Sequence, residues 1–177
     1  MAHMQKMADA GLLVADGPIE NGGRRRGIWI FRDADEQAIR KMAAGDPTLE
    51  GKRLELELFR WLGPAGLGKA YQEAVARDPN AKIGMRSYGL VLLRAAGSAG
   101  APGVESLKRP WAAGKLIAAG PARDGSPYLG VLVFDVKTGD EAAELARQEP
   151  HVAAGRATIE VYTWWCSEKV LPDPQAE

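Results

Sequence analysis

Short apolar runs alternate with turn residues along the whole chain, and their spacing predicts a mixture of helices and strands. Leu54, Leu56 and Leu58, separated by glutamates, give a clear alternation typical of a half-buried strand. For the first half of the chain the pattern predicts, in order, a helix over residues 2–10, strands over 12–15 and 27–31, a helix over about 35–44 and a strand over 54–58.

The second half contains similar elements in a longer series. Residues 63–82 form a linker with a helix-compatible stretch at 69–77, which the Asp78-Pro79 step ends. Residues 97–103 are only Gly, Ala, Ser and Pro and predict a loop. The remaining predicted elements are a strand over 86–94, a helix over about 104–113, strands over 115–119 and 128–135, a helix over about 140–148 and a strand over 157–165.

The chain also matches itself at an offset of 103 residues. Residues 11–18 align with residues 114–121, and the offset then holds without a net insertion as far as Trp61 and Trp164. A fixed offset over some fifty residues predicts one supersecondary unit encoded twice.

The two copies differ at their beginnings. The second copy has the order βαββαβ, with residues 87–94 as its first strand, and the counterpart of that strand falls before residue 1. The first copy therefore shows only αββαβ. Three explanations remain open: the N-terminus was trimmed, the true start lies upstream, or another segment fills the vacant edge. We expect this copy to be the less stable half, because an unpaired strand edge invites strand exchange.

Two helices on one face of a four-stranded antiparallel sheet are the α+β, ferredoxin-like arrangement. We predict two such units, and we expect their sheets to pack against each other through Leu54, Leu56 and Leu58 on one side and Ile159 and Val161 on the other. The predicted organisation is a first copy at residues 1–62, a linker at 63–84, a second copy at 85–166 and a tail at 167–177.

The amino-acid composition limits the classes of molecule that we expect the protein to bind. The 177 residues are 46% hydrophobic and 26% charged, and 23 basic residues balance 23 acidic ones. No global field therefore favours nucleic acid or an anionic membrane. We expect a small-molecule partner, and either a monomer with an internal pseudo-dimer or a homodimer. A cytoplasmic location is the default, since no apolar run could span a membrane; a secreted or lipoprotein form stays open because the N-terminus looks incomplete.

Cysteine and histidine are too few for most metal sites. Cys166 is the only cysteine, and His3 and His151 are the only histidines, at positions that do not match across the repeat. We therefore expect no disulfide within the chain, no metal and no cofactor. A packed thiol is the expected role of Cys166.

Two motifs have simple structural explanations. Residues 63–69 have the glycine and lysine spacing of a phosphate-binding loop, but Ala70 stands where a hydroxyl would bind Mg²⁺, so a Gly-rich turn before a helix suffices. Arg24, Arg25 and Arg26 form the only basic run; we interpret them as a solvated hairpin, with anion binding as the alternative.

A longer series of features resembles the YCII-related (YciI-like) domain family. A helix ends in Gly, Leu-Leu-x-Ala-x-Gly-Pro follows, and then come a strand beginning with Gly, a helix, an acidic residue before Pro, and a strand closing on Trp. The resemblance covers residues 2–61 and 86–165. The same family includes proteins with an Asp-Gly-Pro-Phe motif, which residues 16–19 match except for Ile19 in place of Phe.

This resemblance implies a dimeric α+β barrel and an active site built from a His–Asp pair. Asp46, in the Asp-Pro step, matches the family's aspartate. The matching histidine position falls directly before Met1, and His3, three positions further along the same helix, is the candidate substitute. In the second copy Gly103 and Glu149 occupy the two positions, which predicts a catalytically degenerate half.

Two functions of different classes follow. In the first, the carboxylate orients an imidazole, which moves a proton in lyase, isomerase or dehydrohalogenase chemistry on a small carbonyl or phenolic compound. In the second, the chain is a non-catalytic module that binds a small ligand or another protein. The aromatic residues fit either function, as core or as the wall of a cleft; because Trp61 and Trp164 match across the repeat, we favour packing for these two.

Overall fold

The computed structural model describes residues 2–20, 22–32, 35–97, 114–123 and 125–172, with side chains from residue 6 onward. The helices are α1 (Ala2–Asp9), α2 (Glu36–Ala43), α3 (Pro47–Glu50), α4 (Lys69–Arg77), α6 (Gly139–Ala146) and α7 (Pro150–Ala153). The strands are β1 (Leu13–Glu20), β2 (Gly27–Phe31), β3 (Met85–Ala95), β4 (Leu116–Pro121), β5 (Gly130–Phe134) and β6 (Ala157–Ser167). The helix predicted over 104–113 lies outside the described residues.

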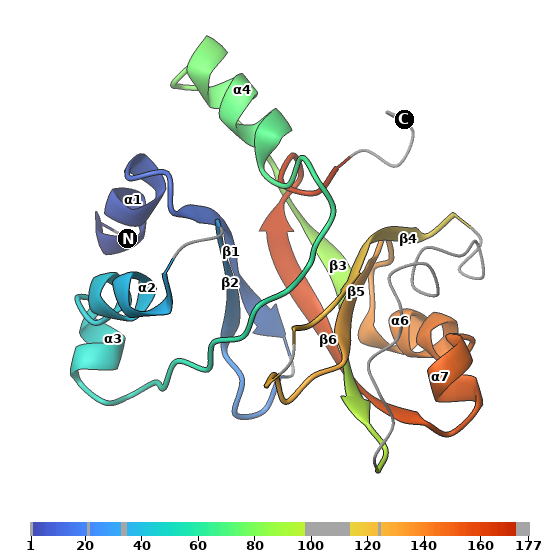
Figure 1. Cartoon of the computed structure of the whole chain (residues 1–177). Coiled ribbons are helices and arrows are strands. Elements are labelled where there is room, and N and C mark those ends of the chain that lie inside the picture. Colours follow the sequence, from blue (N-terminus) through green and yellow to red (C-terminus); the bar gives the residue numbers. More distant parts are fainter. Residues whose placement is uncertain (1, 21, 33–34, 98–113, 124, 173–177) are drawn as a thin grey trace.

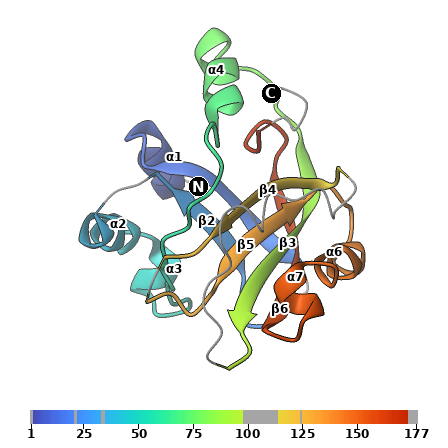
Figure 2. The same cartoon turned by 45° about the vertical axis from the view of Figure 1, so that its right-hand side comes forward.

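The protein is an α+β fold built on one curled antiparallel sheet. The six strands lie in the order β2-β1-β6-β3-β5-β4. Figures 1 and 2 show α1, α2 and α3 on the side of the β1–β2 hairpin and α6 and α7 at the other end, beside β3 and β6. We refer below to residues 2–62 as the first half and to residues 85–172 as the second half.

The two halves contribute unequally to the sheet. β3 and β6 pair at eleven consecutive positions, from Met85↔Ser167 to Ala95↔Ala157. β1 meets β6 at only two, Ile19↔Trp164 and Glu20↔Thr163. The hairpin of the first half is therefore joined to the central strands over a short length.

Residues 103 positions apart, called counterparts below, have matching local structure. The bounds of β2, α2 and α3 are those of β5, α6 and α7 shifted by this offset. Both hairpins have the same irregularity, between Leu13 and Ala15 in one and between Leu116 and Ala118 in the other. The short helices α3 and α7 both start at a proline that follows an acidic N-cap residue.

Counterparts also make the contacts between the halves. The bridge Ile19↔Trp164 has its equivalent in Trp61↔Ala122, whose members are the counterparts of Trp164 and Ile19. A Cβ on Gly17 would overlap with the carbonyl oxygen of Trp165, and a Cβ on Gly120 would overlap with that of Leu62. Glycine is needed at both places because another backbone approaches so closely.

Two apolar clusters form the core. The first lies inside the curl, where Ala15, Ile28 and Ile30 of the hairpin pack with the second-half cluster that includes Tyr88, Leu90, Leu92, Val133 and Trp164. The second lies between the sheet and α6 and includes Val91, Leu93, Leu132, Phe134, Ala142 and Ala146. Alternate residues of β3 enter the two clusters, as the pleat of a strand requires.

The prediction of a strand over 54–58 is wrong. This segment is extended but forms no ladder, Leu54 is 38% exposed, and the first β-bridge after it is at Trp61. In the second half the equivalent strand β6 is paired with β3 along its full length. The first half has no counterpart of β3 among the described residues, so the alternating segment has no neighbouring strand.

The prediction that Leu54, Leu56 and Leu58 pack against Ile159 and Val161 is also wrong. Ile159 and Val161 pack in the cluster under α6, and Leu54 and Leu56 line a depression beside α2 and α3. The sheet residues that meet inside the curl are Ile28 and Ile30 from the hairpin and the other face of β3, β5 and β6. Neighbouring residues of a strand point to opposite faces of the sheet. The prediction assigned Ile159 and Val161 to the inner face, whereas they lie on the face that α6 covers.

Candidate functional site

Asp46 occupies the N-cap position of α3 and is 8% exposed. Its carboxylate accepts hydrogen bonds from the Thr48 amide, at 2.8 Å, and from the Thr48 hydroxyl. The sequence Asp-Pro-Thr explains this geometry, since proline is suited to the first helical position and the aspartate satisfies an amide that has no partner within the helix. The structure thus holds a buried carboxylate in a fixed orientation at the predicted site.

His3 lies within α1, and its side chain is outside the described part of the chain. Figures 1 and 2 show α1 on the same side of the β1–β2 hairpin as α2 and α3. Met7, one turn further along α1, is fully buried and fixes the helix against the rest of the first half. The pairing of His3 with Asp46 stays a prediction.

The counterpart of Asp46, Glu149, makes a contact that the sequence did not suggest. Glu149 is fully buried and accepts hydrogen bonds from the amides of His151, at 2.7 Å, and Val152, at 2.9 Å. Its Oε1 also lies 3.1 Å from Nδ1 of His151. When Nδ1 carries the hydrogen it donates to Glu149, which fixes the tautomer and leaves Nε2 available. The spacing Glu-Pro-His at a helix start is the signal that could have indicated this pair.

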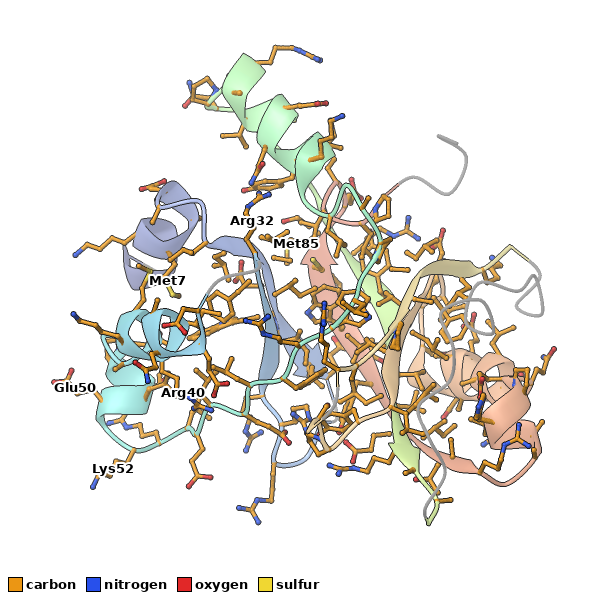
Figure 3. All side chains as sticks on the ribbon, in the orientation of Figure 1. Met7, Arg32, Arg40, Glu50, Lys52 and Met85 are labelled. Atoms are coloured by element: carbon orange, nitrogen blue, oxygen red, sulfur yellow. The ribbon has the colours of Figure 1, made fainter. Side chains whose placement is uncertain are left out.

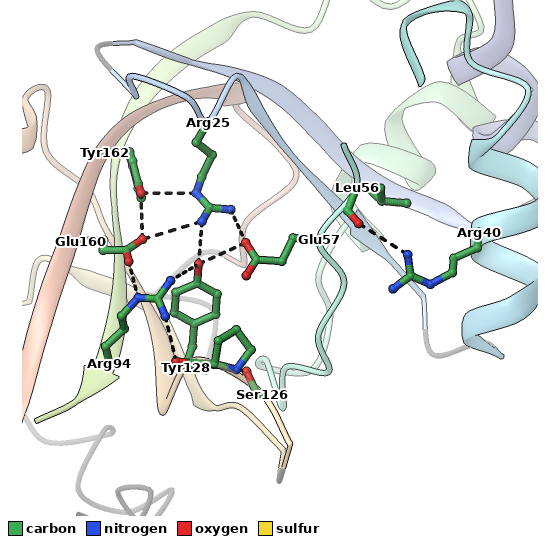
Figure 4. Close-up of polar contacts among 10 residues, drawn as sticks. Arg25, Arg40, Leu56, Glu57, Arg94, Ser126, Tyr128, Glu160 and Tyr162 are labelled. Atoms are coloured by element: carbon green, nitrogen blue, oxygen red, sulfur yellow. Dashed lines mark hydrogen bonds and ion pairs between the residues drawn. The ribbon is translucent and has the colours of Figure 1, made fainter. Parts of the chain in front are cut away.

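A charged cluster joins the two halves at one end of the curl. It consists of Arg25, Glu57, Arg94, Tyr128, Glu160 and Tyr162, which we call the Arg25 cluster (Figure 4). Arg25 donates to Glu57 at 3.0 Å and to the hydroxyls of Tyr162, at 3.3 Å, and Tyr128. Arg94 binds Glu160 and donates to the Tyr128 hydroxyl at 3.1 Å. Arg25 and Tyr128 are counterparts, and so are Glu57 and Glu160.

The electrostatics of the Arg25 cluster favour a structural role. Burial opposes the charge of Arg25, but hydrogen bonds to Tyr162 and Glu57 more than compensate, so its pKa is raised. Burial also raises the pKa of Tyr128 and of Tyr162. Burial raises the pKa of Glu160 as well, but the hydrogen bonds from Arg94 and Tyr162 lower it by more, so the pKa of Glu160 is lowered overall. Near pH 7 the arginines stay charged and the phenols stay protonated, so these four groups have no tendency to exchange protons.

Arg25 corrects our interpretation of the basic run. Arg24 and Arg26 are exposed as predicted, whereas the guanidinium of Arg25 is held between two tyrosine rings, 5.8 Å from the centre of Tyr128 and 5.7 Å from that of Tyr162. Its partners lie between 32 and 137 residues away along the chain. No local pattern distinguishes this arginine from its two neighbours.

Cys166 is buried, and burial raises its thiol pKa to about 12. Such a thiol is almost entirely protonated near pH 7 and is a poor nucleophile. The glycines of residues 63–68 form a turn before α4, in which the Gly68 amide donates to the Val170 carbonyl at 2.7 Å and Lys69 faces Glu73. The Gly68 amide is therefore already engaged and is not available to a phosphate.

Comparison with known families adds one match. The sequence model of the YCII-related domain matches residues 98–165. Residues 98–165 are therefore similar in sequence to this domain. The search of curated proteins and the search of solved structures found no match.

The polar groups described above lie partly inside and partly outside the matched range. The matched range contains Glu149 and His151, and it contributes Tyr128, Glu160 and Tyr162 to the Arg25 cluster. Arg94 precedes the range, and Arg25 and Glu57 come from the first half. Asp46 also lies outside the matched range. The family match is thus confined to residues 98–165, and the first half is related to them only through its counterparts.

Among the described helices, none combines the length and the apolar character needed to cross a membrane. Within the same residues, no three His, Cys, Asp or Glu side chains lie close enough together to hold a metal ion.

Proposed function

We propose that the chain consists of two YciI-like units and that the first performs acid–base chemistry on a small organic molecule through Asp46 and His3. The match to the YCII-related domain covers one unit. Support for the other comes from the shared bounds of the paired helices and strands and from the equivalent contacts between the halves. In this proposal each unit is ferredoxin-like and the two close an α+β barrel.

One observation carries the chemical part of the proposal. The position before the proline of the short helix holds a buried carboxylate in both halves, and in the second half this carboxylate contacts the Nδ1 of an imidazole. The same position in the first half is Asp46. A carboxylate that orients an imidazole is the usual arrangement of a general base that works near neutral pH.

The reaction needs neither a metal nor a redox cofactor. The free imidazole nitrogen takes a proton from a carbon next to a carbonyl, and the electron pair of the broken C–H bond moves to the carbonyl oxygen as an enolate. Return of the proton to another carbon gives an isomerisation. Departure of a leaving group such as chloride, with its bonding electrons, gives an elimination.

The test follows exchange of protons on carbon. A panel of small lactones, ketones and β-chloroketones is incubated with the protein in D₂O, and NMR records the loss of exchangeable C–H signals while an electrode records chloride. We expect Asp46→Asn and His3→Gln each to lower the rate on an active compound by about 10²–10⁴-fold, the usual contribution of a general base. Asparagine is also a good N-cap, so Asp46→Asn should fold.

Asp35→Asn is the matched control. Asp35 caps α2 by accepting from the Ala38 amide at 3.2 Å, and the substitution is chemically identical. We expect it to leave the rate unchanged. Loss of activity in Asp35→Asn as well, or full activity in Asp46→Asn, would contradict the proposal.

A non-catalytic ligand-binding or interaction module is the second candidate. The capping contacts of Asp46 with Thr48 favour it, because a purely structural aspartate would make the same contacts. This function predicts that no compound of the panel undergoes exchange and that Asp46→Asn changes no measured affinity.

A further inference from the structure

A cavity lies in the second half, at the end of the sheet where β3 begins and β6 ends. It has a volume of about 420 Å³ and is lined by Met85, Arg86, Ser87, Lys137, Trp165 and Glu168. Figure 3 shows Met85 at this end of the sheet, from which α4 projects. The cavity shares no residue with the candidate site at Asp46 or with the Arg25 cluster.

The cavity lies beyond the start of α6, on the face of the sheet that this helix covers. Side chains alternate along a strand, so Trp165 points to the same face as Val161, which packs under α6. Ser87 is the partner of Trp165 on β3. A Cβ on Gly139, the first residue of α6, would lie 3.5 Å from Oγ1 of Thr163. The helix therefore begins over Thr163 and leaves the sheet at Trp165 free of its cover.

An indole and a thioether form the apolar wall of the cavity. Trp165 is half-buried, and its Nε1 donates to Glu20 at 2.5 Å, which holds the indole in one orientation. Met85 is 47% exposed, the highest value for a large apolar side chain among the described residues. Its sulfur accepts from the hydroxyl of Ser167 at 3.4 Å. Because indole and thioether groups pack well against apolar and aromatic groups, this wall suits the apolar part of a ligand.

Two opposite charges line the cavity without neutralising each other. The ammonium of Lys137 and the carboxylate of Glu168 have no hydrogen-bond or ion-pair partner within the part of the chain that the structure describes. Glu168 is held in place, since its amide donates to the Gly84 carbonyl at 3.0 Å and its carboxylate lies 2.9 Å from where a Cβ on Gly84 would be. The other cation at the cavity, Arg86, is already paired with Asp135.

We propose that this cavity binds a small zwitterion with an apolar side group, which is the chemistry of a free α-amino acid such as phenylalanine. Lys137 meets the carboxylate of the ligand and Glu168 meets its ammonium group, so the ligand supplies the partner that each side chain lacks. The apolar group of the ligand lies against Trp165 and Met85. A ligand with a single charge would satisfy only one of the two side chains. This binding site does not depend on the acid–base chemistry proposed for Asp46.

The expected affinity is modest. Lys137 and Glu168 are both exposed, and a solvated ion pair raises an affinity by at most about fivefold. We therefore expect binding in the millimolar range, with discrimination that comes from the two charges acting together.

The probe is L-phenylalanine, and two matched ligands each lack one of its charges. Phenylpropionate lacks the ammonium group, and phenylethylamine lacks the carboxylate. Titrations of the full ¹⁵N-labelled chain are followed by NMR, and we expect phenylalanine to bind about three- to fivefold more tightly than either analogue. The ring of the bound ligand should shift the amide signals of residues 85–87 and 165–168 and leave those of Arg25 and Asp46 unchanged.

The spacing of the two charges is tested with a dipeptide. In phenylalanylglycine the ammonium and carboxylate groups lie further apart than in phenylalanine. We expect it to bind more weakly, and tighter binding than that of phenylalanine would overturn the assignment to a free amino acid.

Substitutions in the protein test each charge separately. Lys137→Met should weaken the binding of phenylalanine about three- to fivefold and leave that of phenylethylamine unchanged, because phenylethylamine has no carboxylate. Glu168→Gln should weaken phenylalanine to a similar degree and leave phenylpropionate unchanged. Lys169→Met and Glu144→Gln, at exposed positions that do not line the cavity, are the matched controls and should change no affinity.

The proposal has clear contrary outcomes. Equal affinities of phenylalanine and its two analogues would overturn it, as would the absence of binding or shifts confined to other parts of the chain. Equal weakening of all three ligands by Lys137→Met would also overturn it, since that result would mean that Lys137 only supports the shape of the cavity.

Discussion

β2 and β5 are counterparts of equal length, and their surroundings differ sharply. β5 has a strand on each side and all five of its residues are buried, whereas β2 has one neighbouring strand among the described residues and four of its residues are half-buried. The two strands have similar apolar sequences, Gly-Ile-Trp-Ile-Phe and Gly-Val-Leu-Val-Phe. The comparison teaches that burial here is decided by the neighbouring strands and not by the hydrophobicity of the strand itself.

The contacts between the halves show the same inequality. Trp164 is fully buried inside the curl, and its Nε1 has no hydrogen-bond partner within the described residues. Its counterpart Trp61 is half-buried and donates to the Gly120 carbonyl at 3.1 Å. Trp164 therefore depends on packing, and Trp61 on packing together with a hydrogen bond.

Replacing each tryptophan tests this inequality most strongly. We expect Trp164→Ala to lower the free energy of unfolding by about 3–5 kcal/mol, because it leaves a large cavity in the main core, and Trp61→Ala to lower it by about 1–2 kcal/mol. Urea unfolding followed by circular dichroism measures both. Equal losses would show that the two halves bury their tryptophans equally and would remove the basis of the comparison.

Arg25→Met tests whether the Arg25 cluster holds the halves together. The substitution leaves Glu57 without its arginine and removes two contacts to tyrosine hydroxyls, so we expect a loss of about 1–3 kcal/mol, less than for a fully buried pair because Glu57 is 43% exposed. Arg24→Met, at the exposed neighbouring arginine, is the control and should change stability by less than about 0.5 kcal/mol. Similar effects of both substitutions would mean that Arg25 is as solvated as the sequence suggested.

The smallest expected effect is a pH dependence through Glu160. Its pKa in the folded protein is lowered from the ordinary value of 4.5, so its contribution is fully present above pH 4.5 and is lost as the pH falls through the folded-state pKa. Because Glu160 is partly solvated, we expect this contribution to be below about 1 kcal/mol.

Stability measured from pH 6 to pH 3 checks this dependence. Glu160→Gln and Arg94→Met should each flatten the acid side of the profile relative to the unmodified protein. Thr158→Ala, at an exposed position of the same strand, should leave its shape unchanged. An unaltered profile in Glu160→Gln would show that the ion pair with Arg94 adds nothing to folding.

Much of the secondary structure could be predicted because its causes are local. β2 and α4 have the predicted bounds, and α2 and α6 begin at capping residues that the sequence displays. The strand over 54–58 was predicted from an equally clear alternation and does not form. Alternation indicates which residues can share a face, but a strand also needs a neighbour to accept its backbone hydrogen bonds.

In the candidate site, too, one part could be predicted from local sequence and another part could not. The Asp-Pro step made Asp46 a candidate site residue, and the structure has it buried and hydrogen-bonded at the start of α3, a short helix that the sequence pattern did not predict. The contact of Glu149 with His151 and the position of Arg25 depend on burial and on distant partners, which no spacing along the chain reports.

By itself the sequence determined the offset of 103 residues, the bounds of β2 and α4, and the resemblance that the match over residues 98–165 supports. Only the tertiary structure decided that the hairpin of the first half joins β6 in one curled sheet, that Arg25 is enclosed, and that β2 remains at an edge. The physical reason is that capping and turn formation involve residues a few positions apart. Strand pairing and burial depend instead on segments that are distant along the chain, as β1 and β6 are.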